Sequence, residues 1–172
     1  MKSNQLETNE YAPYHGAYIT EIDPTYTLVE ELEISVHNFV HFVRDIPMDK
    51  YDYRYAEGKW TIKDIIQHLI DSERVFAYRA LRFSRGDTTA LPGFEENSYA
   101  DNAHGDERSI NDLLTEMSAL RHANIMFFKS LKETDLMKKG TASGFTVSVR
   151  ALGFLIIGHQ NHHMKIFKER YL

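Results

Sequence analysis

The sequence predicts an all-α protein, a bundle of four helices preceded by an irregular N-terminal arm. Four stretches of about 20 residues carry apolar side chains near the 3.6-residue period of a helix with one buried face. The length of 172 residues, with 42% apolar and 26% charged residues, suits one globular domain. No internal repeat or linker divides the chain. We therefore expect an arm over residues 1–22 and one domain over 23–172, in which four amphipathic helices pack together.

The four prolines indicate where helices begin and end, because proline is tolerated at helix starts and in loops but not in helix interiors. They are Pro13, Pro24, Pro47 and Pro92. The first helix is expected to begin at Asp23, an N-cap followed by proline at the first helical position, and to end before Pro47. Its predicted apolar stripe comprises Leu28, Leu32, Val36, Phe39, Val43 and Ile46.

Capping patterns mark the second and fourth helices. Thr61 followed by Asp64 three residues later is a variant of the capping box, and Gly86 follows the end of the same apolar pattern. Ser148 comes after the turn sequence GTASGF and is expected to cap a last helix that runs nearly to the C-terminus. These two helices carry four of the nine histidines.

A long connection separates the second helix from the third. It spans about residues 86–108, longer than most loops without secondary structure, which favours a functional lid or a dimer contact. Ser109 and Asp112 then repeat the capping signal, and the third helix is expected to run to about Leu131.

Composition excludes several classes of function. Twenty-five acidic and 20 basic residues give a formal charge of −5, and no Lys/Arg-rich block indicates a nucleic-acid or anionic-membrane surface. No apolar run reaches the roughly 20 residues needed to span a bilayer, and the N-terminus lacks the layout of a secretory signal, so a soluble cytoplasmic protein is expected. The absence of cysteine excludes thiol nucleophiles, disulfides and iron–sulfur clusters. Any metal must be held by nitrogen and oxygen atoms.

Two histidines lie at the centre of the apolar face predicted for the last helix. His159 and His163 are four residues apart, which places their rings one turn apart on one side of the helix. Burying two unpaired imidazoles would cost a few kcal/mol, and a shared metal cation would satisfy both. The alternative is one hydrogen-bonded core histidine beside a surface neighbour. Their apolar neighbours on this face are Leu152, Leu155, Ile156, Ile166 and Phe167.

A third ligand is needed, because stable zinc-type sites usually use three protein ligands and leave a position open. His68 in the second helix is the candidate, although it projects at the margin of that helix's stripe and periodicity supports it only weakly. No Glu-x-x-His motif precedes a histidine, so the carboxylate site of di-iron bundles is not the first choice.

None of the remaining histidines is a first choice as a metal ligand. His37 and His41 have the same four-residue spacing but project away from the apolar stripe of the first helix, so they are interpreted as solvated. His15 in the arm and His104 in the long connection could approach a site by closure, although a surface role is favoured. His122 is interpreted as structural, and His162 projects toward the edge of the last helix's apolar face.

Two sequence blocks carry a family resemblance. WTIKDIIQHLIDSERVFAYRALRFSRGD at residues 60–87 and GHQNHHMKIFKERYL at 158–172 resemble the DinB superfamily, especially its YfiT-like branch of metal-dependent hydrolases. The likeness covers about residues 25–172. It implies a four-helix bundle, commonly a homodimer, with a divalent metal bound by one histidine of the second helix and two of the last.

That pattern falls on His68, His159 and His163, and prefers His163 to His162. Zn or Ni is the favoured ion, and Mn, Fe or Co is compatible with nitrogen ligands. Some relatives are S-transferases that use a low-molecular-weight thiol, so the resemblance implies a hydrolase or a thiol S-transferase acting on a small molecule. The alternatives are a metal-containing binding or sensor protein without turnover and a bundle whose histidines only fill the core.

Three further predictions concern charged and aromatic residues. Asp71, one turn after His68, is the nearest carboxylate by helix position and the candidate general base; the alternative is a solvated helix acid. Glu73 and Arg121 project toward the apolar sides of their helices, so they are expected to form a buried ion pair, with Arg121 as a substrate-carboxylate anchor the alternative. Trp60 either forms a pocket wall or fixes the start of the second helix.

Overall fold

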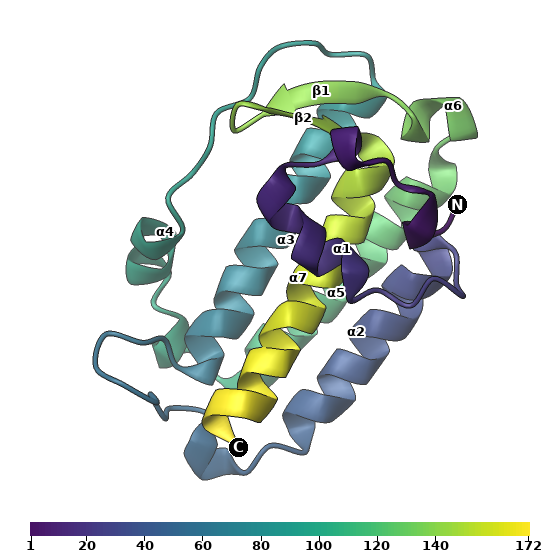
Figure 1. Ribbon diagram of the computed structural model, residues 1–172. Coiled ribbons are helices and arrows are strands. Elements are labelled where there is room, and N and C mark those ends of the chain that lie inside the picture. Colours follow the sequence, from purple (N-terminus) through teal and green to yellow (C-terminus); the bar gives the residue numbers. More distant parts are fainter.

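The computed structural model describes all residues, 1–172, and confirms the all-α prediction (Figure 1). Four long helices form the bundle: α2 (Leu28–Arg44), α3 (Ile62–Ser84), α5 (Ile110–Ser130) and α7 (Val149–Ile166). A π-helical turn, Phe167–Tyr171, continues α7 to the C-terminus. None of the helices is both long and apolar enough to cross a bilayer.

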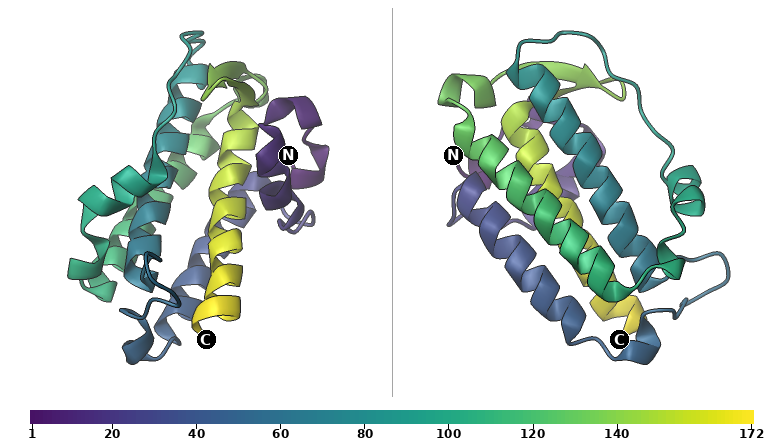
Figure 2. Two further views of the ribbon diagram at one scale, coloured as in Figure 1. Left: turned by 60° about the vertical axis from the view of Figure 1, so that its left-hand side comes forward. Right: turned by 180° about the vertical axis from the view of Figure 1, so that it is seen from behind.

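The arrangement of the four helices explains the long connection after α3. Both α5 and α7 pack against α2 and α3, so α2 and α3 are diagonal to each other, as are α5 and α7 (Figure 2). Helices α3 and α5 run parallel. The backbone N–H of Asp106, just before α5, donates to Asp64 at the start of α3, whereas Lys138, beyond α5, donates to the Ser84 carbonyl at the end of α3. The chain must therefore return along α3, about 34 Å at 1.5 Å per residue.

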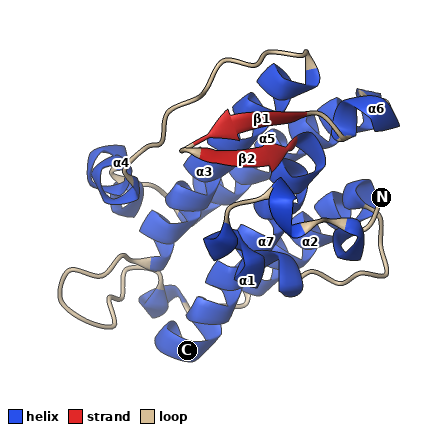
Figure 3. Ribbon diagram, turned by 45° about the horizontal axis from the view of Figure 1, so that its top comes forward, coloured by secondary structure: helices blue, strands red, loops and turns tan.

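Short elements fill the connections between the long helices (Figure 3). Helix α4 (Glu96–Ala103) and a 3₁₀ turn, Gly105–Glu107, lie in the long connection. After α5 come the short helix α6 (Glu133–Leu136) and a hairpin of β1 (Lys139–Ala142) and β2 (Phe145–Ser148). The turn expected at GTASGF is thus the centre of an antiparallel hairpin, which the sequence analysis did not predict.

The helix starts mostly match their predicted caps. The backbone N–H of Asp64 donates to the Thr61 hydroxyl, and Ser109 and Ser148 cap α5 and α7 in the same way. The predicted start of the first helix at Asp23 was wrong. The Asp23 carboxylate instead accepts a hydrogen bond from the Thr25 backbone N–H and closes a turn.

Helix α2 begins one turn later than expected, after Thr27. The Glu30 carboxylate accepts bonds from both the backbone N–H and the hydroxyl of Thr27, at 2.8 and 2.7 Å. This local pair supplies the N-terminal cap, while Asp23 and Pro24 belong to the preceding turn.

The N-terminal arm consists of three 3₁₀ turns and the single helical turn α1 (Gly16–Thr20), and it lies across α7 (Figure 1). Glu10, which is 1% exposed, forms an ion pair with Arg150 at the start of α7 and accepts a hydrogen bond from Ser148. A Cβ atom at position 158 would lie 2.4 Å from the Tyr18 carbonyl oxygen, so the arm's backbone seats directly on Gly158.

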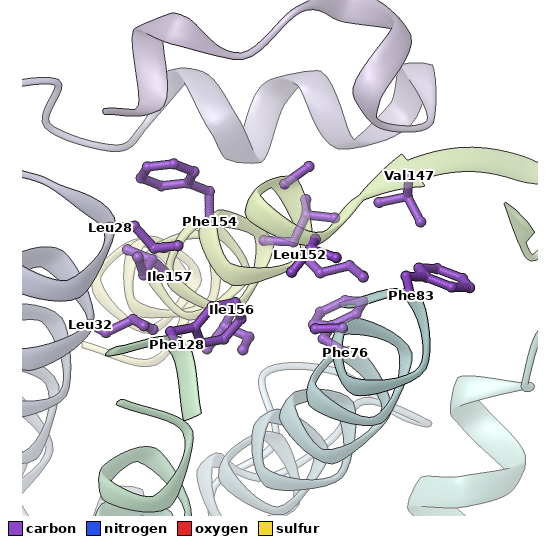
Figure 4. Packing of buried hydrophobic residues seen from close by; sticks show 14 of the residues in the cluster. Leu28, Leu32, Phe76, Phe83, Phe128, Val147, Leu152, Phe154, Ile156 and Ile157 are labelled. Atoms are coloured by element: carbon purple, nitrogen blue, oxygen red, sulfur yellow. The ribbon is translucent and has the colours of Figure 1, made fainter. Parts of the chain in front are cut away.

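The interior contains two hydrophobic clusters with a polar layer between them. One cluster lies toward the hairpin and is shown in Figure 4; it includes Leu32, Phe76, Phe128 and Ile156. The other lies toward the C-terminus and includes Phe39, Ile70, Met117 and Phe167. Along each long helix, buried polar residues lie in sequence between the two apolar sets: Ser35, Glu73, Arg121, Asn124, His159 and Gln160.

Arg121 is the centre of the polar layer. It is fully buried, and its Nε and Nη2 atoms donate to the two carboxylate oxygens of Glu73 at 2.9 and 3.0 Å. It also donates to the Ser35 hydroxyl and to Gln160 Oε1, each at 2.9 Å, while Asn124 donates to Glu73. The predicted ion pair is therefore confirmed, and its bonds join all four helices.

We predict that Arg121→Met lowers the free energy of unfolding by about 3–5 kcal/mol, because it leaves the Glu73 carboxylate buried without its countercharge. Replacing both members, Arg121→Met with Glu73→Met, should recover much of that loss. Urea denaturation of the single and double variants measures both effects.

The exposed pair of Lys129 and Glu33 is the matched control, since it is also an ion pair between α5 and another long helix, here α2. Lys129→Met should change stability by at most about 1 kcal/mol. Equal losses from Arg121→Met and Lys129→Met would contradict a structural role for the buried layer.

Candidate metal centre

Three buried histidines converge between α3 and α7. His68 comes from α3, and His159 and His163 from α7; their exposed fractions are 5%, 7% and 9%. The Nε2 atom of His159 lies 3.0 Å from that of His68 and 3.1 Å from that of His163. The three potential ligand atoms all lie within 4.8 Å of one another. The sequence analysis singled out these three residues, and the structure brings them together.

The polar layer fixes the rotation of α7 about its own axis, and this rotation directs His159 and His163 toward α3. Gln160, next to His159, donates to the Ser35 carbonyl of α2 and accepts from Arg121 of α5, both at 2.9 Å. With Gln160 held on the α2 and α5 side, His159 faces α3. Because His163 is one turn farther along, its ring lies on the same side as that of His159.

Burial keeps all three rings neutral at physiological pH. It lowers the pKa of His68 from 6.5 to about 4. Burial first, and then the charges of neighbouring histidines, lower the pKa values of His159 and His163 well below the ordinary value. Three neutral imidazoles retain the nitrogen lone pairs that bind a metal ion.

The donor chemistry fits a divalent cation better than a set of hydrogen bonds. A neutral ring nitrogen is either a donor or an acceptor, so three Nε2 atoms around one point cannot all be satisfied by one another. Tetrahedral Zn–N bonds of about 2.0–2.1 Å would put ligand nitrogens about 3.3 Å apart. The two shortest separations are within a few tenths of an ångström of that value.

A small pocket lies beside His163. Its volume is about 210 Å³, and Trp60, Asn97 of α4 and Tyr171 contribute to its walls. The Trp60 ring packs on His68 with ring centroids 4.9 Å apart, and its carbonyl accepts a hydrogen bond from Tyr171 at 2.6 Å. Trp60 thus forms the pocket wall that the sequence analysis considered. The other lining residues are Tyr55, Gly58, Lys59, Ile65 and Ile166.

Asp71 lies on a different side of α3 from this pocket. Its two carboxylate oxygens each accept from Gln67 Nε2 at 3.1 Å, and Arg74 donates to it at 3.3 Å. It lines a groove between α3 and α4 together with Ser98 and Tyr99. No hydrogen bond joins Asp71 to the three histidines.

The other histidines stand apart from the triad. His37, His41, His104 and His122 are exposed. His162 is half-buried against Tyr18 of the arm, with ring centroids 4.9 Å apart.

His15 belongs to the arm, and its ring lies near that of Phe76 of α3, with ring centroids 6.4 Å apart. Its Nδ1 atom is buried and makes no hydrogen bond to the protein. Burial, followed by the charge of Arg79, lowers its pKa to about 4.

Some pocket residues were not singled out from the sequence. Asn97 had an indirect signal, because it lies in the unusually long connection. Tyr55 and Tyr171 had none, since each lies in an irregular or terminal segment whose position depends on tertiary packing.

Residues 31–167, which make up most of the chain, match the DinB superfamily. The chain belongs to this superfamily. A Bacillus cereus (strain G9842) protein named "Putative metal-dependent hydrolase" is 22% identical to this member over 140 residues, covering 80% of this chain and 79% of that protein.

Two solved structures show the same fold. YfiT from Bacillus subtilis, described as "a probable metal-dependent hydrolase with an unusual four-helix bundle topology", aligns with a TM-score of 0.75 at 16% identity, covering 93% of this chain and 91% of that one. A DinB-like protein of Bacillus subtilis, YjoA, aligns at 0.55 with 20% identity, covering 81% and 87%. The buried histidine triad of this DinB superfamily member is a group that could hold a metal ion.

We predict that His15 makes the protein less stable in mild acid. Its pKa is about 4 in the fold, where it faces Arg79 and the Tyr14 and Tyr18 rings, against 6.5 unfolded. Between pH 4 and pH 6.5, His15 is protonated in the unfolded chain but not in the folded protein. The stability contribution is therefore complete above pH 6.5 and is lost as the pH falls toward 4.

Urea denaturation at pH 7.5 and pH 5 should show a smaller acid-induced loss of stability for His15→Gln than for the wild type. Equal losses for the two proteins would contradict the assignment of this acid sensitivity to His15.

Proposed function

We propose that this DinB superfamily member binds one divalent metal ion through His68, His159 and His163 and uses it to hydrolyse a small-molecule substrate. The observation that carries the proposal is the convergence of three buried, neutral imidazole nitrogens beside a pocket. The names of the relatives, which describe metal-dependent hydrolases, support it. Zn or Ni is the favoured ion, with Mn, Fe or Co compatible.

A divalent cation on three neutral imidazoles retains its full positive charge, and such an ion lowers the pKa of a bound water or thiol toward neutrality. The chain's own part is to hold the three nitrogens rigidly and to limit access by water. Trp60 covers His68, and Tyr18 packs on His159 with ring centroids 5.6 Å apart. Substrate would approach through the pocket at His163.

Thiol S-transfer is the second candidate reaction. The pocket walls contain no serine, threonine, cysteine or carboxylate. Water or a cosubstrate is therefore the nucleophile that we propose, and a low-molecular-weight thiol would fill the second role. Parallel assays of ester and amide hydrolysis and of S-transfer from bacillithiol-like thiols distinguish the two reactions.

We predict that protein purified without a histidine tag carries close to one equivalent of divalent metal, and that His163→Ala loses at least nine-tenths of it. Elemental analysis measures both, before and after reloading with Zn or Ni. Removing one of three ligands leaves too few nitrogens for a stable site.

His162→Ala is the matched control, because it removes the adjacent ring and should leave the metal content unchanged. Wild-type protein with less than a tenth of an equivalent that cannot be reloaded would refute the metal proposal and favour a core role for the histidines. Full metal content with no turnover would favour the binding or sensor alternative.

We also propose Asp71 as the general base, a role that requires its carboxylate to leave Gln67 and Arg74 and to reach the pocket. Asp71→Asn should then lower kcat by about 100-fold or more. Metal content should be unchanged, since Asp71 makes no contact with the histidines. An unchanged kcat with a small loss of stability would show that Asp71 only anchors Gln67 and Arg74.

The homodimer implied by the family resemblance is a further proposal. Light scattering on the metal-loaded protein measures it directly. The proposed site does not depend on the outcome, because all three histidines come from one chain.

A further inference from the structure

Arg79 is unusual among the buried arginines of this protein. Arg121 pairs with Glu73, and Arg150 pairs with Glu10. Arg79 on α3 is also buried, at 7% exposure, yet its hydrogen bonds go only to neutral oxygens. Buried charges are almost always paired, so an unpaired guanidinium points to a missing anionic partner.

The hydrogen bonds of Arg79 use one nitrogen of its guanidinium. Both bonds come from Nη2, to the Pro92 carbonyl and to the Ser143 hydroxyl, each at 3.0 Å. The Nε and Nη1 atoms donate to no protein acceptor. They do not share an edge of the guanidinium, so each can donate a single hydrogen bond to an anion. Burial also lowers the pKa of Arg79 from its ordinary value, as expected for a cation without a countercharge.

Arg79 lines a groove of about 430 Å³ between α3 and residues 89–94, in the segment that leads to α4. Much of the lining is apolar or aromatic and includes Val75, Phe94 and Tyr99. Arg82 also lines the groove, but it is paired with Asp87. The groove therefore combines one unpaired cation with an apolar wall.

We propose that this groove binds an organic monocarboxylate. The carboxylate pairs with a free N–H group of Arg79, at Nη1 or Nε, and the apolar body of the ligand lies against Val75, Phe94 and Tyr99. One unpaired cation matches one negative charge, and its free N–H groups can donate to a carboxylate oxygen. The apolar wall favours an acid with a hydrocarbon or aromatic tail over an inorganic anion.

This groove is separate from the candidate metal centre. Asn97 of α4 lines the pocket at His163, whereas Tyr99 two residues later lines the groove at Arg79. No histidine of the triad lines the groove. Binding there should therefore be measurable on metal-free protein, and its failure would leave the proposed metal chemistry untouched.

Isothermal titration of metal-stripped protein with acetate, hexanoate and hexanol tests the proposal. Hexanoate should bind saturably with a dissociation constant of about 1 mM or tighter. Acetate should bind more weakly, by about fourfold for each CH₂ group that hexanoate buries. Hexanol, which has the tail without the charge, should bind at least tenfold more weakly than hexanoate.

Arg79→Met should weaken hexanoate binding at least tenfold. Arg82→Met is the matched control, because it removes an already paired arginine from the same groove, and it should keep the affinity within about threefold. Tyr99→Ala, a change at an exposed position, should weaken hexanoate but not acetate, and it tests the tail contact if Arg79→Met fails to fold.

The proposal would be overturned if hexanoate shows no saturable binding, or if Arg79→Met binds hexanoate as tightly as the wild type. Equal affinity of the wild type for hexanol and hexanoate would also overturn it. Preference for chloride or inorganic phosphate over hexanoate, measured in the same titration, would overturn the assignment to an organic acid.

Discussion

The buried charge of Arg121 constrains the rest of this bundle. A guanidinium in the interior requires a carboxylate and further acceptors, and these come from α3, α2 and α7 as Glu73, Ser35 and Gln160. A shift or rotation of any one helix would break a bond to a desolvated charge. The layer therefore sets the height and rotation of all four helices, whereas the apolar clusters on either side supply most of the burial energy.

The histidine triad depends on that constraint. Gln160 holds one side of α7 against α2 and α5, and His159 and His163 consequently face α3, where His68 meets them. Because the rings are desolvated, they stay neutral without help from a nearby base. Burial thus both positions the nitrogens and keeps their lone pairs free.

The sequence was most informative where one local interaction decides the structure. The caps at Thr61, Ser109 and Ser148, and the four-residue spacing of His159 and His163, depend on near neighbours and were readable. Periodicity placed His68 only at the margin because it assumes one buried face, whereas residues 62–70 of α3 are buried on most sides. The hairpin was missed since its strands have four residues each, and the pocket walls from Tyr55 and Tyr171 depend on tertiary packing.

The diagonal placement of α2 and α3, and of α5 and α7, affects how the chain folds. Among the four long helices, no packed pair is joined by a short turn. Helix α2 packs on α5 and α7, and α3 packs on α5 only after the long connection through α4 has run back along α3. Long loops must therefore close before two long helices can pack on each other, unlike in an up-and-down bundle. We expect a higher relative contact order, and a slower folding rate, than those of helical hairpin bundles of similar size.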